Sequence, residues 1–308
     1  MVANLRAKLA PRRAETISCD KTLASEMFLY LVPISTSRSV NAEYGSRPSR
    51  WSIVRETPLT ATERTRSALP SVPDRAPRIV PIVDLQLRDQ VVLVIGGTGL
   101  IGSAVVARLH AEGATAIAAS RHPGNDGIMI DAADEQSLAD GVAEVIRRHG
   151  RIDALVVTAA PAAQTLDPSR SSDPDQVMGA IEAKAMVFLR AATAVIPTMK
   201  KAGYGRIVAI SGQNAFLTGS ITGSVRNAAT IVVAENLADE LANTGILVNA
   251  VSPGTVTTDT GQEVQPGRPG SSTPQQVADL VVFLCSPLSA VSAESIAVGH
   301  RVLGVTSL

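Results

Sequence analysis

Residues 91–102 read Val-Val-Leu-Val-Ile-Gly-Gly-Thr-Gly-Leu-Ile-Gly, and this stretch decides the fold. Its first five residues are apolar and mostly β-branched, which is typical of a strand buried on both faces. Gly96, Gly99 and Gly102 follow at three-residue spacing, and an amphipathic helix is predicted over 101–112. Glycines without Cβ atoms let a phosphate approach the backbone N–H groups at the positive end of that helix. The stretch predicts a nucleotide site, and the alternative is an ordinary strand-to-helix turn.

Strands and helices alternate from this stretch to the C-terminus, which favours the nucleotide site. Further strands are predicted over 115–119, 128–130, 154–158, 206–210, 246–251 and 295–298, and helices over 135–148, 176–202, 220–243 and 274–285. Thr273 is expected to cap the last of these helices, with Pro274 as its first residue. The segment between the second and third strands is too short for a crossover helix. The helix over 176–202 is expected to break or kink near Pro197. Repeated β/α units predict an α/β fold with a doubly wound parallel sheet (Rossmann fold), with the site at the carboxyl ends of the strands.

Residues 1–84 show no sustained helical or strand period and are rich in Arg, Ser, Thr and Pro. We expect a disordered N-terminal extension ahead of a single dinucleotide-binding domain over 85–308. Two alternatives are a targeting peptide and sequence upstream of the true translation start. The acidic side chains of Glu15, Asp20 and Glu26 count against a transit peptide.

Composition excludes several classes of protein. The chain has 28 basic and 28 acidic residues, with no dense basic face of the kind that binds nucleic acid. No apolar run approaches the roughly 20 residues that span a bilayer. Cys19 and Cys285 lie far apart, which fits a reducing cytoplasm, and neither they nor the four His residues have metal-ligand spacing. We expect a soluble, cytoplasmic protein that binds no metal, membrane or nucleic acid.

From about Leu85 onward, the order and spacing of these pieces resemble the short-chain dehydrogenase/reductase family. The resemblance is carried by the glycine turn over 96–102, Asp131 after the third strand, and the motifs over 155–160, 205–211 and 248–258. It implies a nicotinamide cofactor, a small-molecule carbonyl or hydroxyl substrate, and a homodimer or homotetramer. The loop over 261–272, rich in Gly, Pro and Ser, has the length of a substrate lid.

By the same resemblance, the cofactor would lie along the carboxyl ends of the strands. Asp131 would bond the adenine amino group, Ala159 and Ala160 would pass beside the ribose, and the loop after the sixth strand would hold the nicotinamide. The cofactor-binding residues so predicted are Gly96, Thr98, Gly99, Leu100, Ile101, Gly102, Ser120, Arg121, Asp131, Ala132, Ala159, Ala160, Pro253, Gly254, Val256 and Thr258.

The residues that end the second strand favour NADP over NAD. An NAD enzyme places a carboxylate on the adenosine ribose, whereas this chain has Ser120 followed by Arg121. A hydroxyl and a guanidinium attract a 2′-phosphate that a carboxylate would repel. The alternative is that Arg121 is a solvated loop charge.

The usual catalytic groups of the family are replaced in this chain. Members use a Tyr-x-x-x-Lys pair, a Ser ending the fifth strand and often an Asn on the preceding helix. Ungapped counting puts the Tyr position at Gly223, the Lys position at Asn227, the Ser position at Gly212 and the Asn position at Lys184. No Tyr in the chain has a Lys four residues on. Loss of a positioned general acid typically costs about 10²–10⁴ in rate.

Other side chains could take over proton delivery. A bulge at Ser211-Gly212 would bring the Ser211 hydroxyl to the oxyanion, or that hydroxyl bonds local backbone instead. Lys184 could act as acid or electrostatic stabiliser if it is desolvated, or it is a solvated helix-face residue. Asn227 is a third candidate without charge, and Arg226 is expected to serve an interface or a substrate carboxylate.

Three functions remain open at this point. The leading hypothesis is an NADP-dependent oxidoreductase with a non-standard proton-delivery site. The second is a non-redox catalyst on the same fold, such as a cyclase, isomerase or dehydratase. The third is a catalytically silent dinucleotide-binding protein.

Overall fold

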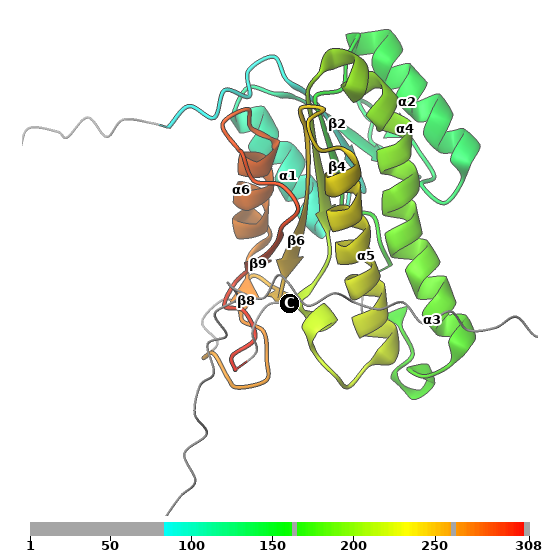
Figure 1. The fold of residues 1–308 in the computed structure, drawn as a ribbon, viewed down its shortest axis with the longest axis vertical. Helices are drawn as coiled ribbons and strands as arrows, with labels where there is room; N and C mark the ends of the chain where they lie inside the picture. Colours follow the sequence, from blue (N-terminus) through cyan, green and yellow to red (C-terminus); the bar gives the residue numbers. More distant parts are fainter. Residues whose placement is uncertain (1–82, 162–164, 260–262, 305–308) are drawn as a thin grey trace, which may run out of the picture. The chain divides into compact units, whose positions relative to one another are not determined.

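The computed structural model describes residues 83–161, 165–259 and 263–304, and a seven-stranded parallel sheet runs through them (Figure 1). The strand order is β3-β2-β1-β4-β5-β6-β9, as in a doubly wound fold, so the predicted fold class is confirmed. The strands are β1 Val91–Ile95, β2 Thr115–Ser120, β3 Ile128–Met129, β4 Ala154–Val157, β5 Gly205–Ile210, β6 Ile246–Pro253 and β9 Ser295–Val298. The predicted extension, residues 1–84, lies almost wholly outside the described residues.

Helices cover both faces of the sheet (Figure 1). α1 (Leu100–Ala111) and α6 (Pro274–Cys285) pack on one face, where Val92, Val94 and Val156 are fully buried. α2 (Glu135–His149), α4 (Val187–Ala202) and α5 (Ile221–Glu240) pack on the other face, against a core that includes Leu93, Leu155 and Ile207. All five residues of β1 are buried, as the apolar run predicted.

β2 and β3 are joined without a crossover helix, as predicted from the short segment between them. They pair in parallel through Ala119 with Ile128 and Ser120 with Met129. β3 is an edge strand of two residues, and the loop that leads to it begins at the carboxyl end of β2. This arrangement leaves Ser120 and Arg121 at the carboxyl edge of the sheet.

The predicted helix over 176–202 is interrupted, but not where Pro197 led us to expect. α3 (Pro174–Ile181) passes into a π-helical segment, η3 (Glu182–Met186), and then into α4. Pro197 lies inside α4, which continues to Ala202, so the expected break there is wrong. Proline removes one hydrogen bond, and burial of Val195 and Met199 on either side of it holds the turn in place.

Side-chain caps begin α5 and α6, and the cap of α6 was predicted from the sequence. The Thr273 hydroxyl accepts from the Gln276 amide at 3.1 Å and the Gln276 side chain accepts from the Thr273 amide at 2.9 Å, which completes a capping box before Pro274. Ser220 caps α5 through the Gly223 amide. Among the described residues, no helix combines the length and apolar character needed to cross a membrane.

Candidate functional site

The glycine turn between β1 and α1 brings two pieces of backbone into close approach. Gly96 has φ +83°, and a Cβ on it would lie 2.6 Å from the Ala159 amide nitrogen. A Cβ on Gly102 would lie 2.1 Å from the Gly96 carbonyl oxygen, so the first turn of α1 packs directly on the loop. Gly99 is the N-cap of α1, and no side chain accepts hydrogen bonds from the first-turn amides. These amides and the helix dipole favour an anionic group at this position.

A cleft of about 520 Å³ opens beside this turn, at the carboxyl ends of β1, β2 and β4. It is the size of a small-molecule site. The predicted cofactor-binding residues that line it are Gly96, Thr98, Gly99, Ser120, Arg121, Asp131, Ala132, Ala159 and Ala160. Leu100, Ile101 and Gly102 form the start of α1 next to it.

Ser120, Arg121 and Asp131 line the end of the cleft beside β2 and β3, at the edge of the sheet. The Ser120 hydroxyl accepts from the His122 amide at 3.2 Å, and a carboxylate oxygen of Asp131 accepts from the Ala133 amide at 3.1 Å. Arg121 is exposed and takes part in no ion pair among the described residues. Its guanidinium is therefore available to an anionic group in the cleft.

The residues predicted to hold the nicotinamide lie at the end of β6 and do not line this cleft. Pro253 is the last residue of β6 and pairs with Val298. A Cβ on Gly254 would lie 2.1 Å from the Gly270 carbonyl oxygen. β7 (Thr255–Val256) pairs with β8 (Ser271–Ser272), so part of the predicted lid loop is tied to the segment that carries Val256 and Thr258. Residues 260–262 of this loop lie outside the described residues.

Lys184 is the most unusual charged side chain near the site. It lies in the π-helical segment η3 and is 7% exposed, so it is not a solvated helix-face residue. Its Nζ donates to the Asn227 side-chain oxygen at 2.6 Å and to the Ser211 carbonyl oxygen at 3.0 Å. Desolvation, with a smaller effect from the nearby Arg226 charge, lowers the pKa of Lys184 to about 7. At that pKa the ammonium form can give up a proton, and the neutral amine can take one, near neutral pH.

Ser211 and Asn227 support Lys184 from both sides, so all three predicted catalytic residues meet. The Ser211 hydroxyl donates to the backbone carbonyl of Asn227 at 2.9 Å, and the Asn227 amide nitrogen donates to the Gly223 carbonyl at 2.9 Å. β5 and β6 pair without interruption up to Ile210 with Val251, and the Ser211 amide continues this pattern to the Val251 carbonyl. The bulge that we considered at Ser211-Gly212 is absent because the ladder runs straight through, and the hydroxyl is turned toward α5.

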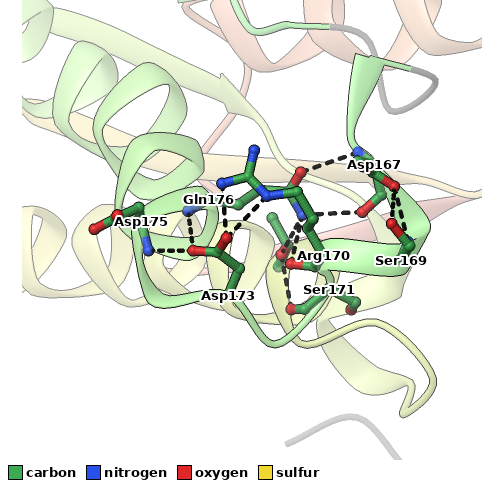
Figure 2. A network of polar contacts seen from close by, with 8 residues as sticks. Asp167, Ser169, Arg170, Ser171, Asp173, Asp175 and Gln176 are labelled. Atoms are coloured by element: carbon green, nitrogen blue, oxygen red, sulfur yellow. Dashed lines mark hydrogen bonds and ion pairs between the residues drawn. The ribbon is translucent and has the colours of Figure 1, made fainter.

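A polar network holds residues 167–176, just before and at the start of α3, and Figure 2 shows its labelled members. Asp173 caps α3, and its carboxylate pairs with the Arg170 guanidinium at 2.7 Å. The Gln176 side chain accepts from the Asp167 amide at 3.0 Å and donates to the Arg170 carbonyl at 2.8 Å. The Ser171 carbonyl accepts from the amide of Thr222 at 3.2 Å and from its hydroxyl at 2.9 Å. The network therefore ties the loop before α3 to the first turn of α5, which carries Gly223.

Gln213 is a buried polar residue that the sequence analysis did not single out. Its side-chain nitrogen donates to the Val298 and His300 carbonyls at 3.3 Å, and its side-chain oxygen is buried without a partner. The signal available in the sequence was a polar residue shortly after a buried strand.

Burial raises the pKa of the Cys285 thiol to about 12, which leaves the thiol unreactive. The described residues hold no group of three or more His, Cys, Asp or Glu placed for a metal ion.

Comparisons with known proteins agree on one family. The sequence model described as short chain dehydrogenase matches residues 90–269. Dehydrogenase/reductase SDR family member 4 of Oryctolagus cuniculus is 31% identical over 236 residues, which are 65% of this chain and 88% of that protein. The 3-oxoacyl-(acyl-carrier-protein) reductase of Escherichia coli (strain K12) is 28% identical over 236 residues, 66% of this chain and 92% of its own length.

The solved structures that resemble the chain have the same fold. The ligand-free aldohexose dehydrogenase of Thermoplasma acidophilum superposes with a TM-score of 0.61 at 22% identity, and the match covers 73% of this chain and all of that one.

Proposed function

The chain belongs to the short-chain dehydrogenase family, and we propose that it is an NADP-dependent oxidoreductase that interconverts a carbonyl and a hydroxyl group. Proteins named as dehydrogenases and reductases are its relatives, and the family generally binds NAD or NADP. The observation that carries the proposal is the cleft beside the glycine turn, where the first-turn amides of α1 have no side-chain cap. A pyrophosphate fits there because backbone donors and the helix dipole stabilise its charge.

The choice of NADP rests on the far end of the cleft. Ser120 offers a hydroxyl and Arg121 an exposed guanidinium, and neither repels a 2′-phosphate. The bound cofactor would supply or accept the hydride. Gly96, Thr98 and Gly99 would hold the pyrophosphate, Asp131 and Ala132 the adenine, and Ala159 and Ala160 the ribose. Pro253, Gly254, Val256 and Thr258 remain our candidates for the nicotinamide end.

Lys184 is our candidate for the proton donor. Gly223 has no side chain to donate a proton, and Asn227 carries no charge. The chain thus has a lysine, Lys184, at the family's Asn position and an asparagine, Asn227, at the family's Lys position. The 2.6 Å hydrogen bond from Lys184 Nζ to the Asn227 side-chain oxygen keeps a cation between α5 and the end of β5. In carbonyl reduction, the protonated Lys184 would stabilise the developing alkoxide and deliver its proton.

The test is NADPH oxidation by purified protein over a panel of aldehydes and ketones. We expect turnover by the wild type and a loss of about 10²-fold or more in Lys184→Met, the usual effect of removing a general acid. Lys200→Met, on the exposed last turn of α4, is the control and should keep full activity. Product formed without NADPH consumption would support a non-redox catalyst instead. Tight NADPH binding without any reaction would support a silent binding protein.

We also propose that the protein is a homodimer or homotetramer, as family members commonly are. Ile221, Val225 and Val232 expose apolar side chains along α5. Burying such a face against a second copy would remove it from water. Light scattering in solution checks this, and a monomer at micromolar concentration would contradict it.

A further inference from the structure

Two cationic side chains are buried side by side behind the cleft. Lys184 is 7% exposed and Arg226 is 5% exposed, and Arg226 is close enough to help lower the pKa of Lys184. Neither forms an ion pair with an acidic side chain among the described residues. Arg190 on α4 differs in its charge, which is paired with Glu182 and Glu135, although its Nη1 atom is also buried without a partner.

Arg226 is the member of this pair that cannot become neutral. Lysine can shed its proton when buried, but a guanidinium keeps its charge at any pH that the protein tolerates. The Nη1 atom of Arg226 donates to the Pro161 carbonyl at 3.2 Å, whereas its Nε is buried without a partner. Burial of an unpaired charge is costly, so a binding group of opposite charge is expected nearby.

The position of the pair points to the cleft as the source of that group. Pro161, which accepts from Arg226, lines the cleft, and so do Ala183 and Val187 on either side of the Lys184 segment. The guanidinium therefore lies behind the wall of the cleft formed by the segment that follows β4.

We propose that Arg226 binds a carboxylate of the substrate, so that the enzyme acts on oxo acids or hydroxy acids in preference to neutral carbonyl compounds. This inference rests on the proposed oxidoreductase function. The carboxylate would accept charge-assisted hydrogen bonds from the Nη atoms of the guanidinium, which, unlike Nε, are not enclosed without a partner. The carbonyl of the same molecule would then face Lys184. Arg226 is thus assigned a role in substrate specificity, and Lys184 keeps the role in proton transfer.

A thermal unfolding series tests the anion site without any cofactor. Malonate is the probe, and malonamide is its neutral counterpart at matched ionic strength. We expect malonate to raise the Tm of the wild type, malonamide to leave it unchanged, and Arg226→Met to lose the malonate effect. Arg190→Met removes a compensated arginine and should retain it. An equal response to both compounds in the wild type, or a full malonate response in Arg226→Met, overturns the proposal.

Kinetics then test the specificity. With NADPH, we expect Arg226→Met to lower kcat/KM for acetoacetate about 10-fold to 100-fold more than kcat/KM for methyl acetoacetate, the usual effect of losing a charged hydrogen bond. Equal losses on the acid and the ester mean a structural role and contradict the proposal. If Arg226→Met does not fold, Arg226→Gln and the wild-type comparison of malonate with malonamide decide. Absent NADPH binding would refute the oxidoreductase proposal, whereas the malonate response reports on the anion site alone.

Discussion

Lys184 links the site to the stability of the whole protein, because its pKa differs between the folded and unfolded chain. Burial and the Arg226 charge lower it to about 7, whereas a solvated lysine titrates near about 10.4. Between these two values the folded state binds fewer protons than the unfolded state. The free energy of unfolding should therefore rise with pH across this window, by at most about 1.4 kcal/mol per pH unit.

Urea unfolding of the wild type and Lys184→Met at three pH values in that window measures this effect. The wild type should gain stability relative to the variant as pH rises, since the cost of the buried charge disappears when Lys184 loses its proton. Lys200→Met, at an exposed position, should follow the wild type. Parallel pH profiles for the wild type and Lys184→Met would mean that Lys184 is not desolvated.

Single residues also show the limit of reading the site from sequence. Counting from the strands singled out Lys184 and Asn227, Ser211 was the neighbour of the counted Gly212, and the structure brings the three together. The sequence could not predict that the Ser211 hydroxyl bonds the backbone of α5, or that Arg226 is buried. Both depend on how α5 packs against β5 and the loop after β4, and that packing is set by contacts far apart in the chain.

At the scale of elements, the glycine turn makes a sharp prediction. A Cβ at Gly102 would lie 2.1 Å from the Gly96 carbonyl oxygen, a contact that only a backbone shift can relieve. We expect Gly102→Ala to lower the free energy of unfolding by about 1–3 kcal/mol and to weaken NADPH binding, because the turn would move away from α1. Gly124→Ala is the control, since a Cβ there meets nothing within 4 Å. Urea unfolding and a fluorescence titration with NADPH check both variants. Unchanged stability and affinity in Gly102→Ala would contradict the close packing.

Most elements could be predicted from local pattern alone. β1 was evident from its apolar run, and α6 from Thr273 and Pro274 at its start. The π-helical segment η3 was not predictable, because an apolar face continues through it and no proline or glycine marks it. Pro197 suggested a break that the buried face of α4 prevents. Burial of the face of α4 thus outweighed the local signal of the proline.

On the scale of the whole molecule, the parallel sheet explains why distant residues form one site. The strands of a parallel sheet end at the same edge, so β1, β2, β4 and β5 deliver the glycine turn, Ser120, Ala159 and Ser211 to one side. Fold class followed from the β/α alternation. The role of each residue along this edge could not be predicted in the same way, because it depends on which side chains line the cleft and which lie behind it.

The most direct test of this account is the dissociation constant of NADPH, compared with that of NADH, for the wild type and Arg121→Glu. We predict that the wild type binds NADPH about tenfold or more tightly than NADH, since Arg121 would pair with the 2′-phosphate. Arg121→Glu should lose this preference and keep its affinity for NADH. A wild type that binds neither dinucleotide, or that binds NADH more tightly, would contradict the proposed cofactor site.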